Sequence, residues 1–199
     1  MKLGVLALQG GFREHKKILE GLGAECFEVR LPSHMEGLSG LVIPGGESTA
    51  IAKLAVEYNL VGPIRSFAEQ QKPVWGTCAG AIFMSKNPGT DQVVLGLMDV
   101  TIKRNAFGRQ VDSFEAKVEL FLQQDERMGD NKKGHKDSFE GVFIRAPVIE
   151  SIGSEAEVVG RLTSGEIVAA KQKKWLVTVF HPELTKDYRI HKYFLDTCR

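Results

Sequence analysis

An apolar strand runs into a glycine-flanked turn at Pro73-Val74-Trp75-Gly76-Thr77-Cys78-Ala79-Gly80. The pattern Gly-x-Cys-x-Gly between a strand and a helix is typical of a nucleophile elbow, a turn so tight that Cβ atoms at the flanking positions clash. Such a turn lifts its central side chain above the carboxyl edge of a sheet, where open α/β sheets bind ligands. The helix that follows favours a thiolate at its N-terminus. A buried, inert cysteine in a Gly-rich turn is the alternative interpretation of Cys78.

Short apolar runs alternate with helical patterns around this turn. The predicted strands of the first half are Leu3–Leu8, Cys26–Val29, Leu41–Ile43 and Pro73–Trp75. The predicted helices are Phe12–Leu22, Ser48–Tyr58 and Val61–Gln71. Continuous apolar strands that alternate with helices indicate a parallel sheet covered on both faces.

The second half contains β-rich runs with few helices between them. These runs are Val93–Lys103, Ala116–Leu122, Val142–Arg145, Val158–Arg161, Glu166–Lys171 and Trp175–Phe180, and an amphipathic helix follows at Asp187–Cys198. We therefore expect a doubly wound, flavodoxin-like α/β fold, with a mostly parallel sheet flanked by helices and antiparallel β additions in the C-terminal half. Without repeats or a linker, residues 1–199 are predicted to form a single domain.

The composition is that of a soluble globular protein, with 43% hydrophobic and 26% charged residues. A net charge of +1 gives no reason to expect nucleic acid or an anionic membrane as partner. No apolar run is long enough to span a bilayer, and the first strand is too short for a signal peptide. Cys26, Cys78 and Cys198 are far apart and odd in number, so we expect free thiols and a cytoplasmic location.

The segment Gln123–Ser138 is the one stretch of low hydrophobicity. Its acidic and basic side chains balance one another, and we expect a mobile surface loop. A loop that contacts a partner is the alternative.

His181-Pro182-Glu183 follows the last apolar strand, so it is expected at the carboxyl edge of the sheet. A thiolate nucleophile needs a group that gives and takes protons, and histidine titrates in the right range. Glu183 is close enough to orient the imidazole. An isolated His-Pro-Glu is usually a surface turn, but together with the cysteine elbow it indicates a Cys78–His181–Glu183 triad.

A Gly-rich loop, Pro44-Gly45-Gly46-Glu47-Ser48-Thr49, lies between a strand and a helix. It lacks the spacing of a phosphate-binding loop, so we expect it to cap the helix and to offer backbone N–H groups to an oxyanion, beside the N–H of Ala79. The remaining histidines are interpreted as incidental, with no metal-ligand spacing; they are His15, His34, His135 and His191.

Six segments along the chain together resemble the class I, triad-type glutamine amidotransferases. They are Val5–Gly10, Ile43–Thr49, Trp75–Gly80, Arg104–Glu115, Gly141–Pro147 and Phe180–Leu184. The elbow and His-Pro-Glu are general to the family, whereas Arg104–Glu115 and Val142-Phe143-Ile144-Arg145-Ala146-Pro147 resemble the branch that serves vitamin B6 biosynthesis. The charged segment 123–138 departs from the short bacterial pattern.

The resemblance implies roles for individual residues. Cys78, His181 and Glu183 match the triad, and Gln9-Gly10 matches a loop that completes the oxyanion hole when a partner docks. The positions that match glutamine-binding residues are Gly46, Glu47, Ser48, Arg104, Ile144 and Arg145. An arginine fork suits the α-carboxylate of glutamine, and an acid such as Glu47 suits its α-ammonium. Solvated charges at strand ends are the alternative for Arg104 and Arg145.

The implied reaction is hydrolysis of L-glutamine through a thioester on Cys78. The resemblance further implies that the ammonia passes to a synthase subunit that builds pyridoxal 5′-phosphate, and that this chain carries no cofactor or metal. Two other hypotheses remain open: another cysteine-elbow α/β protein of the chaperone or peptidase type, and a non-catalytic binding subunit that keeps the fold.

Overall fold

A computed structural model describes residues 1–104, 113–122 and 137–199 of the chain. Within these ranges the strands are β1 (Lys2–Leu6), β2 (Glu25–Val29), β3 (Gly40–Ile43), β4 (Val74–Thr77), β5 (Ser85–Asn87), β6 (Met98–Lys103), β7 (Ser113–Leu120), β8 (Asp137–Ile144), β9 (Val148–Ile152), β10 (Glu157–Leu162), β11 (Ile167–Gln172) and β12 (Trp175–Thr178). The α-helices are α1 (Phe12–Gly21), α2 (Ser48–Glu57), α3 (Val61–Glu69), α4 (Ala79–Met84) and α5 (Arg189–Thr197), and the 3₁₀ helices are η1 (Pro32–Met35) and η2 (Pro182–Leu184).

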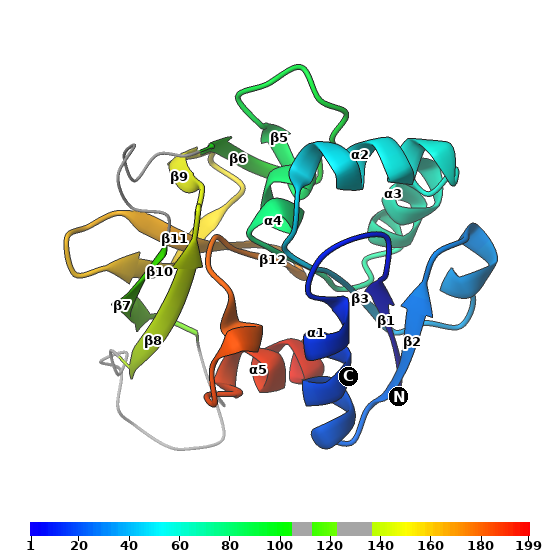
Figure 1. Cartoon of the computed structure of the whole chain (residues 1–199), viewed down its shortest axis with the longest axis horizontal. Coiled ribbons are helices and arrows are strands. Elements are labelled where there is room, and N and C mark those ends of the chain that lie inside the picture. Colours follow the sequence, from blue (N-terminus) through cyan, green and yellow to red (C-terminus); the bar gives the residue numbers. More distant parts are fainter. Residues whose placement is uncertain (105–112, 123–136) are drawn as a thin grey trace.

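Parallel strands form one half of the sheet, in the order β2-β1-β3-β4-β12. This is the 2-1-3-4-5 order of flavodoxin-like folds. Helices α1 and α5 cover one face of these strands, and α2, α3 and α4 cover the other (Figure 1). Every residue of β3, β4 and β12 is buried, because both faces of each strand are covered. The predicted doubly wound α/β fold is confirmed.

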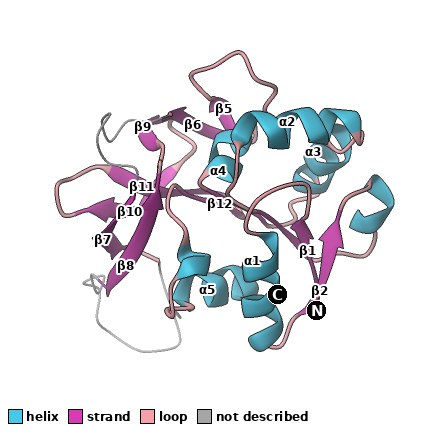
Figure 2. Ribbon diagram, viewed as in Figure 1, coloured by secondary structure: helices cyan, strands magenta, loops and turns pink. Residues whose placement is uncertain are grey.

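Antiparallel strands extend the sheet beyond β12. Strands β11, β10, β7 and β8 follow in that order, and β9 pairs with both β11 and β6. Figure 2 shows these strands gathered away from the helices that cover the parallel half. In β7 buried and more exposed positions alternate towards its C-terminal end, as expected for a strand that packs on one face only. The expected antiparallel additions are therefore present.

The topology brings four loops to one edge of the sheet. Parallel strands β1, β3, β4 and β12 all end there, and the winding direction reverses between β1 and β3, which is where such folds form a binding crevice. The loops after β1 and β3 contact each other, because the N–H of Gly11 donates a hydrogen bond of 3.1 Å to the carbonyl of Gly45.

Several predicted boundaries were wrong. Strand β6 begins at Met98, five residues after the predicted Val93, and β8 begins at Asp137, which the sequence placed in a loop. Strands β5 and β9 were not expected, since both are short and carry exposed charged residues such as Lys86 and Glu150. Residues 123–136 of the predicted loop, and 105–112 of the Arg104–Glu115 run, lie outside the described residues.

In the described part of the chain, no helix combines the length and the apolar character needed to cross a bilayer.

Candidate active site

Cys78 lies in a strained turn between β4 and α4. Its backbone angles are φ 47° and ψ −105°, a region that side-chain-bearing residues rarely adopt and that is tolerated where the surrounding fold enforces it. The flanking glycines make this turn possible. A Cβ at Gly80 would lie 2.0 Å from the carbonyl oxygen of Ile43, and one at Gly76 would lie 2.6 Å from that of Gly80. The geometry is that of a nucleophile elbow, as predicted.

His181 and Glu183 follow β12 and form the turn that leads into η2. The N–H of His181 donates to the carbonyl of Val142 on β8, which fixes the backbone at this point. The Nδ1 atom of His181 lies 2.7 Å from Oε1 of Glu183, so Nε2 remains for the hydrogen bond with Cys78. The Glu183 side chain is 2% exposed. Residues from β4 and from the end of β12 thus meet at one edge of the sheet.

The charges of these groups reinforce one another. Burial on its own would lower the pKa of His181, but hydrogen bonds with Cys78 and Glu183 raise it to about 10. Burial on its own would raise the pKa of Glu183, but its contacts with His15 and His181 hold this pKa well below its ordinary value of 4.5. Glu183 is therefore ionised and His181 protonated at neutral pH.

The loop after β3 packs directly on the cysteine and the histidine. The N–H of Gly45 donates to Thr77 Oγ1 at 2.8 Å, which ties the loop to β4. Glu47 is the N-cap of α2, because its carboxylate accepts hydrogen bonds from the N–H groups of Thr49 and Ala50 at 3.1 and 2.6 Å. The N–H of Glu47 donates to Oε1 of Gln9 at 2.6 Å. The loop is thus fixed from both sides.

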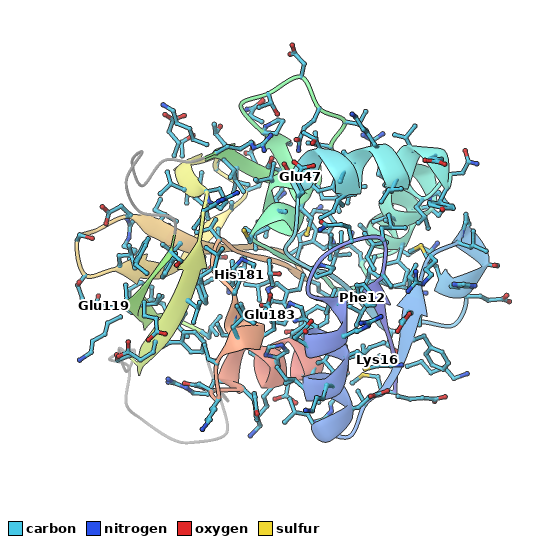
Figure 3. The ribbon with its side chains drawn as sticks, viewed as in Figure 1. Phe12, Lys16, Glu47, Glu119, His181 and Glu183 are labelled. Atoms are coloured by element: carbon cyan, nitrogen blue, oxygen red, sulfur yellow. The ribbon has the colours of Figure 1, made fainter. Side chains whose placement is uncertain are left out.

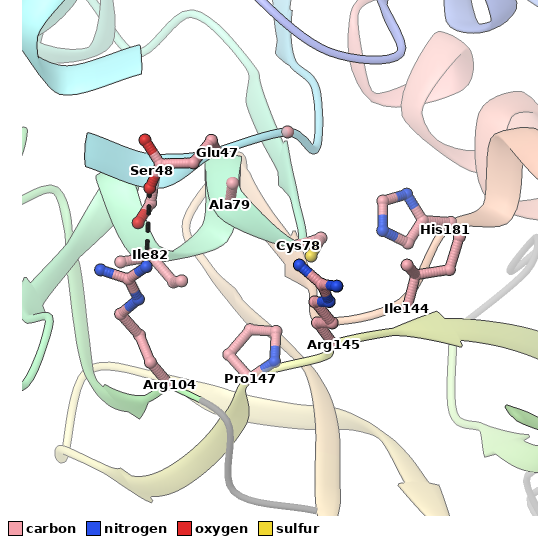
Figure 4. Close-up of a pocket in the computed structure, with 11 residues that line it drawn as sticks. Glu47, Ser48, Cys78, Ala79, Ile82, Arg104, Ile144, Arg145, Pro147 and His181 are labelled. Carbon is pink, nitrogen blue, oxygen red and sulfur yellow. Dashed lines mark ion pairs between the residues drawn. The ribbon is translucent and has the colours of Figure 1, made fainter. Parts of the chain in front are cut away.

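A pocket of about 380 Å³ opens beside Cys78 and His181. It is lined by Gly46, Glu47, Ser48, Cys78, Ala79, Ile82, Arg104, Ile144, Arg145, Pro147 and His181. Figure 4 shows Glu47, Ser48 and Ala79 on one side of it and Arg104, Pro147 and Arg145 on the other. The volume lies within the range of about 300–1,000 Å³ that is usual for small-molecule sites.

A family model of the SNO glutamine amidotransferase family matches residues 5–199. The chain belongs to this family.

Individual relatives are similar along their whole length. The chain is 49% identical over 199 residues to the pyridoxal 5′-phosphate synthase subunit PdxT of Pelotomaculum thermopropionicum. That alignment covers 100% of this chain and 95% of the relative. The chain is 50% identical over 196 residues to the protein of the same name from Moorella thermoacetica, with 98% of each covered. A crystal structure described as a glutamine amidotransferase has a TM-score of 0.86 at 47% identity and covers 98% of both chains. The expected family and fold are confirmed.

All six predicted substrate-binding positions of this SNO amidotransferase line the pocket. They are Gly46, Glu47, Ser48, Arg104, Ile144 and Arg145. Arg104 lies 3.5 Å from the Glu47 carboxylate, and Ser48 donates to Oε1 of Gln92 at 3.1 Å. Of the predicted oxyanion group, Gly46 and Ala79 line the pocket too.

Gln9 and Gly10 do not line the pocket; they lie behind the loop after β3. Gly10 has φ +92°, and a Cβ there would lie 1.7 Å from the carbonyl oxygen of Gly45. Their contacts are with the backbone of that loop, and an oxyanion role for them stays a prediction.

Two histidines that the sequence analysis dismissed belong to this site, and that interpretation was wrong. His15 on α1 and His191 on α5 are both fully buried, and His15 lies 3.3 Å from the Glu183 carboxylate. Their polar sequence neighbours concealed this, because the contact joins segments that are distant in the sequence. Two further residues were missed as site residues. Gly45 packs against Cys78 and His181, and Pro147 lines the pocket. The described residues contain no cluster of three metal-ligating side chains.

Proposed function

We propose that this chain hydrolyses L-glutamine to L-glutamate and ammonia through a thioester on Cys78, and that it supplies the ammonia to a synthase subunit that makes pyridoxal 5′-phosphate. The observation that carries the proposal is that His181 interacts with both Cys78 and Glu183 beside a pocket at the carboxyl edge of the sheet. The whole chain acts as one glutaminase domain.

The first half of the reaction forms the thioester. The thiolate of Cys78, paired with protonated His181, attacks the carbon of the glutamine side-chain amide, and the electron pair of the C=O bond moves to oxygen. The backbone N–H groups of Gly46 and Ala79 donate to this oxyanion. His181 then gives its proton to the amide nitrogen as the C–N bond breaks. Ammonia leaves, and a γ-glutamyl thioester remains on Cys78.

The second half regenerates the enzyme. His181, now neutral, removes a proton from a water molecule, and the resulting hydroxide attacks the thioester carbon. The C–S bond breaks, glutamate leaves, and the thiolate and imidazolium are restored. Throughout both halves Glu183 holds the imidazole by its Nδ1–H, since a carboxylate at this position fixes the tautomer and stabilises the imidazolium.

The far wall of the pocket suits the head group of an α-amino acid. Glu47 and Arg104 present a carboxylate and a guanidinium 3.5 Å apart, and Arg145 lines the same pocket. An arginine fork pairs with the α-carboxylate, and the acidic side chain attracts the α-ammonium. Glu47 also caps α2, so its position is fixed before substrate arrives. The side-chain amide of the substrate then points towards Cys78.

The partner follows from the chemistry of ammonia and from the relatives. Free ammonia becomes ammonium in neutral water and loses its nucleophilicity, so direct delivery to a synthase has a physical advantage. The relatives from Pelotomaculum thermopropionicum and Moorella thermoacetica are both named as subunits of pyridoxal 5′-phosphate synthase. The free thiols of Cys26, Cys78 and Cys198 suit a reducing compartment, and we assign the protein to the cytoplasm.

The test is glutamine hydrolysis by Cys78→Ala in the presence of the synthase subunit. The variant is expected to release no glutamate, while the complex still makes pyridoxal 5′-phosphate when an ammonium salt replaces glutamine. Cys198→Ala, which removes a thiol remote from the pocket, is the matched control and keeps wild-type activity. Glutamate release by pure Cys78→Ala contradicts the nucleophile. A wild-type complex that uses ammonium but never glutamine identifies a non-catalytic subunit instead.

A further inference from the structure

Two fully buried imidazoles lie behind the Glu183 carboxylate, on the side away from Cys78. His15 comes from the first turn of α1 and His191 from the first turn of α5. Figure 3 shows Glu183 between His181 and the start of α1, where Phe12 is labelled. A buried imidazole is costly unless its ring nitrogens have partners, so the contacts of these two rings are informative.

The contacts form a chain that ends at the carboxylate. Nδ1 of His15 lies 3.0 Å from Nε2 of His191. Nε2 of His15 lies 3.3 Å from Oε2 of Glu183 and 3.3 Å from Oγ1 of Thr77. The other carboxylate oxygen, Oε1, contacts Nδ1 of His181 at 2.7 Å. Each oxygen of Glu183 thus faces a different imidazole.

Little else holds Oε2 in place. Within the described residues this buried oxygen forms no hydrogen bond of good geometry, so the 3.3 Å contact with His15 is its polar anchor. The Oε1 side is closed by Gly11, where a Cβ would lie 3.1 Å from Oε1. The terminal torsion of a glutamate is soft, and a carboxylate anchored through one oxygen turns easily.

The proton positions can be assigned from the network. Burial, with His15 beside it, lowers the pKa of His191 to about 3, so His191 is neutral and carries one N–H. Its Nδ1 has no hydrogen-bond partner in the described part of the chain. A buried N–H without an acceptor is costly, so we assign the proton to Nε2, which donates to Nδ1 of His15. With Nδ1 of His15 accepting from His191, Nε2 is the nitrogen left to donate on the side of Thr77 and Glu183.

We propose that His15 is a positioning residue of the active site: it holds Oε2 of Glu183 so that Oε1 stays aligned with His181, and His191 fixes the tautomer in which His15 can do so. The inference rests on the proposed function, because it assumes that Glu183 orients the catalytic histidine. His15 touches neither the pocket nor the reacting atoms. It can act on the site through Glu183 or through Thr77, and a double-mutant cycle with Glu183 separates the two routes.

Two amide substitutions separate this role from simple packing. In His15→Gln the side-chain nitrogen reaches the place of Nε2 and keeps a donor to Glu183. In His15→Asn the amide reaches only the place of Nδ1, where its oxygen can accept from His191, and the contact with Glu183 is lost. Both are polar and fit the space, so their stabilities are comparable. At saturating glutamine with the synthase subunit, kcat is expected to fall about tenfold in His15→Asn and less than about threefold in His15→Gln, with KM changed little in either.

A double-mutant cycle tests whether the effect passes through Glu183. In a Glu183→Gln background, His15→Asn is expected to change kcat by less than about twofold, because the orienting group is already lost. Trp75→Phe is the packing control, since the Trp75 ring lies 5.2 Å from His15 and 4.9 Å from His191 and donates only to Thr178. Trp75→Phe is expected to lower the melting temperature and to leave kcat unchanged.

A second readout needs no glutamine. Alkylation of Cys78 by iodoacetamide, measured by peptide mass spectrometry, is expected to slow in His15→Asn and not in His15→Gln. The proposal is overturned if kcat falls equally in His15→Asn and His15→Gln. It is also overturned if His15→Asn lowers kcat by the same factor in the wild-type and the Glu183→Gln backgrounds. If the two variants alkylate in this pattern but the wild-type protein hydrolyses no glutamine, the proposed function is overturned and the positioning role stands.

Discussion

Gly45 packs directly against the catalytic face of His181. A Cβ placed on Gly45 would lie 2.5 Å from Cε1 of the His181 ring and 3.2 Å from Cβ of Cys78. The absence of a side chain at this position is what allows the cysteine and the histidine to meet beneath the loop after β3.

The first prediction is that Gly45→Ala lowers kcat about a hundredfold or more and leaves the fold intact. The new methyl group must displace either the His181 ring or the loop that carries Gly46, and both place a reacting group wrongly. Gly62→Ala is the control, because a Cβ there meets nothing within 4 Å. Steady-state glutamine hydrolysis with circular dichroism checks both variants. Unchanged turnover in Gly45→Ala means that the loop moves away freely.

Local spacing explains what the sequence could predict. The elbow, the strand before it and His181-Pro182-Glu183 are each contiguous, and a Gly-x-Cys-x-Gly turn needs no distant partner to be recognised. The alternation of apolar strands and helices likewise predicted the parallel half of the sheet.

Distant contacts explain what the sequence could not predict. His15 and His191 are 176 positions apart, and nothing in either helical pattern indicates that the two rings meet behind Glu183. Strand β9 exists because it pairs with β6 and β11, and its own sequence contains two exposed polar residues, Glu150 and Ser151. Both depend on tertiary contacts, which periodicity does not report.

The second prediction ranks two members of the triad. His181→Asn is expected to lose more than about a thousandfold in kcat, because both the acid and the base of the reaction disappear. Glu183→Gln is expected to retain at least about ten times more activity than His181→Asn, since it removes only the orienting charge. Single-turnover glutamate formation measures both. If Glu183→Gln is the slower variant, the two roles are assigned wrongly.

The third prediction concerns the strain at the elbow. Cys78 has φ 47° and ψ −105°, which costs about 1–3 kcal/mol for a residue with a side chain and little for glycine. The greater chain entropy of unfolded glycine offsets about 0.5–1 kcal/mol of this. Cys78→Gly is therefore expected to be inactive yet more stable than Cys78→Ala in urea denaturation. A less stable glycine variant shows that the turn is not strained.

The fourth prediction is a loss of stability in mild acid caused by His191. Burial, with the neighbouring His15, lowers its pKa from 6.5 to about 3, while the ionised Glu183 opposes this shift. As the pH falls, the imidazole of His191 therefore takes up a proton in the unfolded chain before it does so in the folded one. The stability that is present above pH 6.5 is lost as the pH falls from 6.5 towards 3. The slope is about 1.4 kcal/mol per pH unit.

The matched variant for this effect is His191→Gln, which cannot take up a proton. Between pH 6.5 and 5 the wild type is expected to lose about 2 kcal/mol more unfolding free energy than His191→Gln, as measured by urea denaturation at each pH. If the unfolding free energies of the two proteins fall in parallel with pH, the acid sensitivity comes from groups other than His191.

The last prediction is that the isolated chain is a slow glutaminase and that the synthase subunit accelerates it. The loops after β1 and β3 are coupled, because Gly11 donates to the carbonyl of Gly45 and Gln9 accepts from the N–H of Glu47. A partner that binds over Gln9-Gly10 therefore acts on the backbone that carries Gly46, the expected oxyanion donor. A missing donor in such a hole typically costs about a hundredfold in rate.

Docking would stabilise the state in which this donor is aligned, by a shift between two loop conformations. Glutamine hydrolysis at saturating substrate is expected to rise at least about tenfold when the synthase subunit is added, and KM is expected to change less than kcat. Gly10→Ala separates this gate from the chemistry, because a Cβ there would collide with the Gly45 carbonyl at φ +92° and push the loop out of register. The variant is expected to bind the synthase and remain slow, whereas alkylation of its Cys78 by iodoacetamide continues. A free chain that turns over as fast as the complex leaves Gln9-Gly10 as an ordinary turn.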